Sequence, residues 1–153
     1  MSIAKRLAEL GLELPQAPAP VAAYVPYVRT GNLIFISGQI PMAQGKLICA
    51  GPTPTEVPPD KAKAAARMCA LNLLAALNSA TGDLDRVTRV VRLGVFVAST
   101  PEFTGQPGVA NGASELMVEV FGEAGRHARA AVGTNVLPLG ATVEVEGVFE
   151  VAG

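Results

Sequence analysis

The alternation of side chains near the end of the chain is typical of a β-strand with one covered face. Residues 141–151 place Ala, Val, Val, Gly, Phe and Val at every second position, with three glutamates between them. Shorter runs with strand composition predict five further strands, at 24–29, 33–39, 46–49, 87–97 and 128–135. The run 87–97 has β-branched residues on both faces, so we expect it at the centre of the sheet.

Helical spacing of apolar residues predicts three helices. A short amphipathic helix covers 3–10 and ends at Gly11, and a longer one covers 60–80 and ends at Gly82. A third covers 109–121. Strands, helix, strand, helix and strands in this order predict an α+β domain, whose first three strands form a meander. Its mixed sheet then carries both long helices on one face.

Composition predicts one domain that associates with copies of itself. The chain has 153 residues, which leaves room for one core. We expect an arm with a proline-rich connector over 1–20, containing Pro15, Pro18 and Pro20, and a folded domain over 21–153. Charged residues make up 16%, against about 25% in an average soluble domain. An oligomer would cover the open face of the sheet.

Several function classes find no support in the sequence. The longest charge-free stretch, 30–45, is interrupted by glycines and Pro41, so we predict no membrane span and a cytoplasmic protein. One histidine, His127, and two separated cysteines, Cys49 and Cys69, predict no metal site, and both cysteines are expected in the core. No nucleotide-binding glycine motif occurs, and we expect no cofactor. A net charge of -1 without a basic stripe argues against nucleic acid as a partner.

A few polar residues stand where the pattern expects apolar ones. Arg129 begins an otherwise small and apolar strand, where it could hold a carboxylate or pair with a surface acid. Glu144 and Glu146 share the polar face of the last strand and are either functional or merely solvated. Ser37 precedes Gly38 at the end of a strand, where a glycine indicates a close approach of backbone or ligand, or strand termination.

Three further polar residues have simpler explanations. Asn72 and Asn111 lie in apolar helical runs and need hydrogen-bond partners if they are buried; helix capping or loop bracing is the default role. His127 is either a general base or, as we favour, an exposed turn residue. A serine–histidine–acid triad would have to be built on His127 alone and is disfavoured.

Taken together, these segments resemble the YjgF/YER057c/UK114 family, also called RidA or "endoribonuclease L-PSP". The similarity covers about residues 20 to 151. Its matching pieces are VPY at 25–27, GNLIFISGQIP at 31–41, ALNLL at 70–74, the strand 91–97, Asn111, AR at 128–129, LP at 137–138 and VEVE at 143–146.

The resemblance implies a fold, an assembly and an activity. It implies a chorismate-mutase-like homotrimer with three clefts between subunits. Members hydrolyse reactive enamines and imines, such as 2-aminoacrylate and 2-iminopropanoate, to 2-oxo acids and ammonia. By position, Arg129 matches the arginine that holds the substrate carboxylate and Glu144 the glutamate that activates water. Tyr27, Ser37 and Asn111 match residues lining the same cleft.

This sequence also departs from the family pattern. Ala131 stands where the family often has cysteine, so only its backbone carbonyl could accept a hydrogen bond from substrate. His127 stands where proline is frequent, and the arm is extra. The leading hypothesis is therefore a 2-imino acid deaminase. A non-catalytic trimer that binds 2-oxo acids is the alternative, and an endoribonuclease or translation inhibitor is a weaker one.

Overall fold

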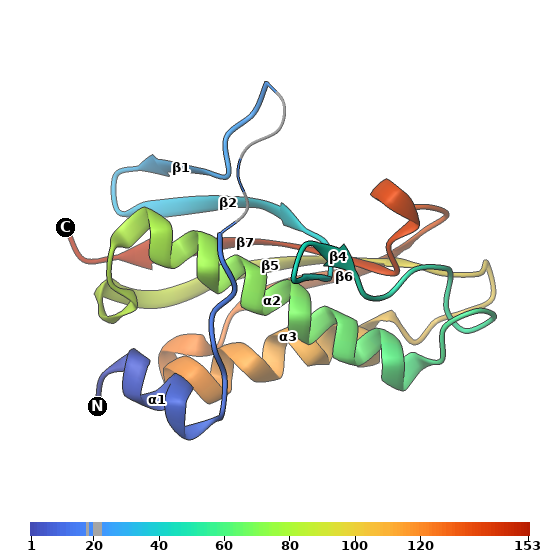
Figure 1. Ribbon diagram of the computed structural model, residues 1–153, viewed down its shortest axis with the longest axis horizontal. Coiled ribbons are helices and arrows are strands. Elements are labelled where there is room, and N and C mark those ends of the chain that lie inside the picture. The colour runs from blue at the N-terminus through green and yellow to red at the C-terminus, as the bar shows by residue number, and fades with distance from the viewer. Residues whose placement is uncertain (18, 20–22) are drawn as a thin grey trace.

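The core of the molecule is a mixed five-stranded sheet in the order β1-β2-β7-β5-β6. The computed structural model describes residues 1–17, 19 and 23–153 (Figure 1). Only β5 and β6 pair in parallel, and the other neighbours are antiparallel. The strands are β1 (Tyr27–Thr30), β2 (Leu33–Gln39), β5 (Val87–Ala98), β6 (Ala128–Thr134) and β7 (Val143–Val151), with a separate hairpin of β3 (Met42–Ala43) and β4 (Lys46–Leu47).

Two long helices cover one face of this sheet, as expected for the α+β fold. These are α2 (Pro59–Thr81), which packs on β2 and β7, and α3 (Gln106–Phe121), which packs on β5 and β6 (Figure 1). The helices approach closely at Gly112, where a Cβ atom would overlap the backbone carbonyl of Lys63. A glycine is therefore needed where α3 crosses α2. The described residues also form three short 3-10 turns: η1 (Leu84–Arg86), η2 (Gly122–Gly125) and η3 (Pro138–Gly140).

Two expectations about the sheet are wrong. Residues 46–49 do not form a third strand of a meander, because Lys46 and Leu47 pair only with β3 in the separate hairpin. The centre of the sheet is β7, flanked by β2 and β5, and β5 lies one place from the edge. The apolar character of β5 on both faces has a local cause: beyond its helix-facing side, Phe96 packs in a small cluster with Leu137 and Ile40.

The last strand alternates as its sequence predicts. In β7, Val143, Val145 and Phe149 are buried against the helices, whereas Glu144 and Glu146 lie half-buried on the opposite face. That opposite face also carries exposed apolar side chains: Val28 is 53% exposed and pairs with Phe35, 45% exposed. Val132 of β6 is 45% exposed as well. Among the described residues, no element covers this face of the sheet.

The amino-terminal arm packs against the helices. It begins with α1 (Ile3–Glu9), which is capped by Ser2 and buries Leu7, and Arg6 Nε donates to the Glu119 carbonyl of α3 at 2.7 Å. The expected prolines at 18 and 20, and the expected domain boundary between residues 20 and 21, lie outside the described residues. No helix in the described part of the chain is long and apolar enough to cross a membrane.

Candidate functional site

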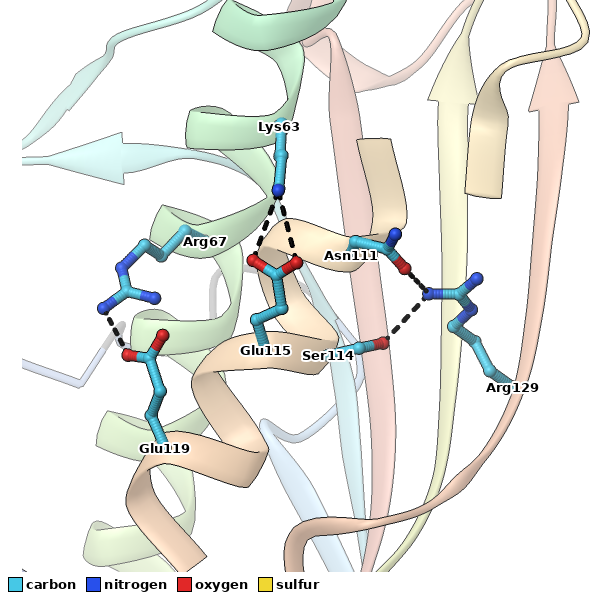
Figure 2. A network of polar contacts seen from close by, with 7 residues as sticks. All are labelled: Lys63, Arg67, Asn111, Ser114, Glu115, Glu119 and Arg129. Carbon is cyan, nitrogen blue, oxygen red and sulfur yellow. Dashed lines mark hydrogen bonds and ion pairs between the residues drawn. The ribbon is translucent and has the colours of Figure 1, made fainter. Parts of the chain in front are cut away.

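Arg129 lies on the edge strand β6 with its side chain directed at α3. Its Nη1 donates to Asn111 Oδ1 at 2.8 Å and to Ser114 Oγ at 3.1 Å (Figure 2). Among the described residues, no carboxylate lies within 4.0 Å of this guanidinium, so Arg129 is not the acid-paired surface arginine that was one sequence interpretation. Asn111 accordingly does not brace a loop or cap a helix but accepts from Arg129.

The acidic residues of α3 are engaged elsewhere. Glu115 and Glu119 pair with Lys63 and Arg67 of α2, at 3.2 and 2.9 Å (Figure 2). They occupy the α2 side of the helix, one turn apart, whereas Asn111 and Ser114 occupy the β6 side. Arg129 therefore faces only neutral acceptors on α3.

The two hydrogen bonds from Nη1 also determine which N–H donors of Arg129 are available to a ligand. Nη1 carries two hydrogens, and Asn111 and Ser114 accept one each. The Nε and Nη2 hydrogens have no acceptor among the described residues. These form a parallel fork that matches the two oxygens of a carboxylate.

His127 is not the exposed turn residue that we expected. Its ring is half-buried, with Nδ1 2.6 Å from the Gly125 carbonyl oxygen and Nε2 2.9 Å from Ser114 Oγ. Burial, the largest effect, lowers the pKa of His127; the hydrogen bond with Gly125 raises it in part, and the charge of Arg129 makes a smaller contribution that lowers it. The ring is therefore neutral near pH 7. A carbonyl rather than an acid holds Nδ1, so no serine–histidine–acid triad forms.

Glu144 lies on the other face of the sheet, over a bulge in β2. The pairing of β2 with β7 shifts between Ile36 and Gln39, and the carboxylate sits directly over Gly38. A Cβ atom at Gly38 would lie 2.5 Å from Glu144 Oε1. Burial raises the pKa of Glu144, and the neighbouring charge of Glu146 raises it further. The close approach at Gly38 thus involves a side chain of the candidate site.

The remaining candidates divide between these two places. Ser37 neighbours Gly38, and its Oγ donates to the Val25 carbonyl at 2.7 Å. Tyr27 is half-buried against the core and pairs with Ile36. Ala131 lies two residues beyond Arg129 on the same edge strand.

Arg129 and Glu144 do not meet within one chain. β5 separates β6 from β7, so their strands are about 10 Å apart, and the two side chains leave opposite faces. The structure thus brings Arg129 together with Asn111, and Glu144 together with the Ser37–Gly38 bulge, as two separate half-sites.

Sequence reasoning missed Ser114. It lies three residues after Asn111, the spacing that puts two helical side chains on one face, and this was the available signal. Two assignments hold: Asn72 braces a loop by donating to the carbonyls of Ile40 and Met42, both at 3.1 Å, and Cys69 is fully buried. Cys49, in contrast, is only partly buried. Glu146 lies 3.9 Å from Arg92 across the open face, in keeping with a structural role.

A cavity of about 690 Å³ opens where β2 ends. Its walls come from the arm, the end of β2, the β3–β4 hairpin and α2, including Gln16, Tyr24, Ser37 and Gln44. Of the described residues that line it, none is charged, and neither Arg129 nor Glu144 is among them. Ser37 and Gly38 line the cavity, and Gly38 also adjoins Glu144.

Comparisons with known proteins agree with this architecture. Residues 4–150 match the family model described as "YjgF/chorismate mutase-like, putative endoribonuclease". The protein TCP17 of Trypanosoma cruzi is 48% identical over 97% of this chain and 93% of its own length. The crystal structure of Atu1372 from Agrobacterium tumefaciens, described as of unknown function, superposes with a TM-score of 0.92 at 48% identity, covering 98% and 92% of the two chains.

A more distant relative carries an enzyme name. The 2-iminobutanoate/2-iminopropanoate deaminase of Dermatophagoides farinae is 27% identical over 90% of this chain and 92% of its own length. The family model spans nearly the whole chain, including most of the arm, and the α+β sheet with its two helices fits it. The chain therefore belongs to the YjgF/YER057c/UK114 (RidA) family.

Proposed function

We propose that this protein is a deaminase that hydrolyses small 2-imino acids, and their 2-amino-acrylate tautomers, to 2-oxo acids and ammonia. The observation that carries the proposal is Arg129: a half-buried guanidinium with no acidic partner among the described residues and a free Nε–Nη2 fork. Such a group has its full charge available for a carboxylate. The name of the Dermatophagoides relative supports the same substrate class.

Hydrolysis of an imine requires only a bound carboxylate, an oriented water molecule and a group that transfers protons. Water adds to the electrophilic imine carbon, Glu144 takes one proton from that water as the C–O bond forms, and this proton is passed to the imine nitrogen to give the carbinolamine. Glu144 then takes the second proton, from the carbinolamine hydroxyl, and passes it to the same nitrogen. The C–N bond breaks, ammonia leaves, and the C=O bond of the 2-oxo acid forms. Arg129 holds the substrate carboxylate throughout, which orients the imine carbon toward the water. Because burial raises the pKa of Glu144, it is a stronger base than an ordinary glutamate once ionised.

The proposal requires two copies of the chain at each site. Arg129 and Glu144 leave opposite faces of one sheet, so a single substrate can touch both only if they come from different subunits. The uncovered face with Val28, Phe35 and Val132 offers an apolar surface for that contact. We propose a homotrimer with clefts between subunits, which would join the two half-sites.

The test is the release of pyruvate and ammonia from 2-aminoacrylate generated enzymatically in the assay. We expect wild-type protein to accelerate release, and Arg129→Lys to lose about 10- to 100-fold in kcat/KM, because lysine keeps the charge but loses the fork. Arg126→Lys is the matched control, since Arg126 is exposed and, among the described residues, forms an ion pair with Glu123 alone. Equal rates for wild type and Arg129→Lys would refute the role of Arg129.

A carboxylate-binding protein without turnover is the second candidate. This candidate is favoured because Arg129, Asn111 and Ser114 come together within one chain, and binding a carboxylate there needs no contribution from Glu144. Binding of 2-oxobutanoate that Arg129→Ala abolishes, without acceleration of imine hydrolysis, would select this function over the deaminase.

A further inference from the structure

A continuous chain of hydrogen bonds runs from the Gly125 carbonyl to Arg129. It passes through His127 Nδ1 and Nε2, then Ser114 Oγ, with lengths of 2.6, 2.9 and 3.1 Å. It joins η2, β6 and α3 behind the guanidinium. Neither Ser114 nor His127 belongs to the residues matched to the family pattern.

Each group in this chain has only one possible role. A carbonyl oxygen can only accept, so the ring hydrogen is on Nδ1 and is donated to Gly125. Nε2 then carries a lone pair, and the Ser114 hydroxyl donates to it. The hydroxyl hydrogen of Ser114 is therefore used in the bond to His127, and the hydroxyl oxygen accepts a hydrogen bond from Arg129 Nη1. The neutral imidazole thus forces the serine to act as an acceptor.

This arrangement fixes the plane of the guanidinium. Asn111 and Ser114 lie one helical turn apart and hold the two hydrogens of the same nitrogen. Rotation about the Cζ–Nε bond of Arg129 would break both bonds. The Nε–Nη2 fork is therefore held in one orientation before any ligand arrives, which lowers the entropy lost on binding.

We propose that Ser114 and His127 are positioning residues that orient the Arg129 fork for a planar carboxylate of a small 2-oxo or 2-imino acid. This inference rests on the proposed function only for the class of ligand. Ser114 and His127 do not form a serine–histidine–acid triad, because the Gly125 carbonyl rather than an acid holds His127 Nδ1.

The direct test follows ligand affinity and guanidinium motion in the full-length protein. Pyruvate is titrated calorimetrically into wild type, Ser114→Ala, Ser114→Thr and the control Ser79→Ala, which alters an exposed serine of α2. We expect Ser114→Ala to weaken pyruvate binding about five- to tenfold and to raise KM with little change in kcat. Threonine keeps the hydroxyl and should restore both, and Ser79→Ala should match wild type.

Nitrogen-15 NMR supplies a readout that needs no ligand. The Arg129 Nε–H signal is assigned by its loss in Arg129→Lys, and restricted rotation should keep its Nη hydrogens distinct in wild type and merge them in Ser114→Ala. The chain has one histidine, so the ring signals are unambiguous, and Nδ1 should carry the hydrogen. His127→Phe and Ser114→Ala should also be non-additive, the double variant binding no worse than the weaker single variant.

The outcomes separate this inference from the deaminase proposal. If pyruvate binding weakens in Ser114→Ala but wild type hydrolyses no imine, the positioning role stands and the deaminase falls. If wild type is an active deaminase and Ser114→Ala keeps its KM and pyruvate affinity, the positioning role is overturned. If wild type neither binds pyruvate nor hydrolyses imines, both are overturned.

Discussion

Replacing Gly38 by alanine should disable Glu144 without disturbing the fold. The added Cβ atom would lie 2.5 Å from Glu144 Oε1 and 3.0 Å from Cδ. Ordinary carbon–oxygen contact requires about 3.4 Å or more, so the carboxylate must move by about 1 Å. The group that moves is the end of a flexible side chain, and the backbone at Gly38 does not have a positive φ. The structural cost is therefore small.

The catalytic cost should be large. A misplacement of about 1 Å can reduce a rate by about 100-fold, because the base no longer reaches the water in line with the imine carbon. We expect kcat for 2-aminoacrylate hydrolysis in Gly38→Ala to fall by about this factor. Pyruvate affinity should be retained, since the group that holds the carboxylate is Arg129, whose bonds to Asn111 and Ser114 the substitution leaves in place. The melting temperature should stay constant or rise slightly, because alanine restricts the unfolded chain.

Gly108→Ala is the matched control for this prediction. Gly108 lies in α3, has no positive φ, and nothing lies within 4 Å of a Cβ added there. It should keep full activity. If Gly38→Ala keeps kcat within twofold of wild type while Glu144→Gln is inactive, the position of the carboxylate is not limiting and the reasoning fails. If Glu144→Gln is fully active, Glu144 is not the base.

Three further predictions concern charge, packing and assembly. Burial and the charge of Glu146 raise the pKa of Glu144, so the folded protein loses stability as the pH rises through that pKa and the carboxyl group ionises. Glu144→Gln should abolish this loss in denaturant titrations at different pH values. The variant should also have a higher melting temperature than wild type at neutral pH. In wild type, kcat should rise with pH over the same window as the base ionises. Gly112→Ala should destabilise the fold by about 1 to 3 kcal/mol in urea unfolding, since its Cβ would overlap the Lys63 carbonyl; a loss below about 0.5 kcal/mol would contradict the close crossing. Phe35→Glu should reduce the mass in light scattering from that of the proposed trimer to that of a monomer, while leaving the circular dichroism spectrum unchanged. An unaltered mass would remove the open sheet face from the proposed interface.

The sequence was most informative where one residue stood out against a regular pattern. The alternation in β7 was enough to place Glu144 and Glu146 on the open face, since a strand has only two faces. Arg129 likewise stood out, because it is the one charged residue in a strand of small, uncharged residues. The run 46–49 misled, because a short apolar segment does not reveal its pairing partner, and here it joins a local hairpin.

The surroundings of His127 were beyond sequence reasoning for a different cause. Its partner Ser114 is 13 residues away, on the preceding helix, and the contact depends on how α3 is rotated over β6. That rotation is set by the close crossing at Gly112 and by the ion pairs to α2. The sequence pattern predicts which face of each helix is buried, but it does not predict the side-chain contacts that form when two helices pack together on a sheet.

Within the part of the chain that the structure describes, neither charged group proposed to act on substrate has a neutralising partner. Around Arg129, the acids of α3 are drawn to α2, and the acceptors that remain, Asn111 and Ser114, are neutral. Around Glu144, the carboxylate lies over Gly38, and the neighbouring charge that raises its pKa is a second glutamate, Glu146. An acid beside Arg129 or a lysine at position 38 would lower the electrostatic cost of the folded chain, but it would also occupy the group that a ligand needs. These two charges, of opposite sign and on opposite faces of the sheet, are the groups that the proposed cleft between subunits would bring to one ligand.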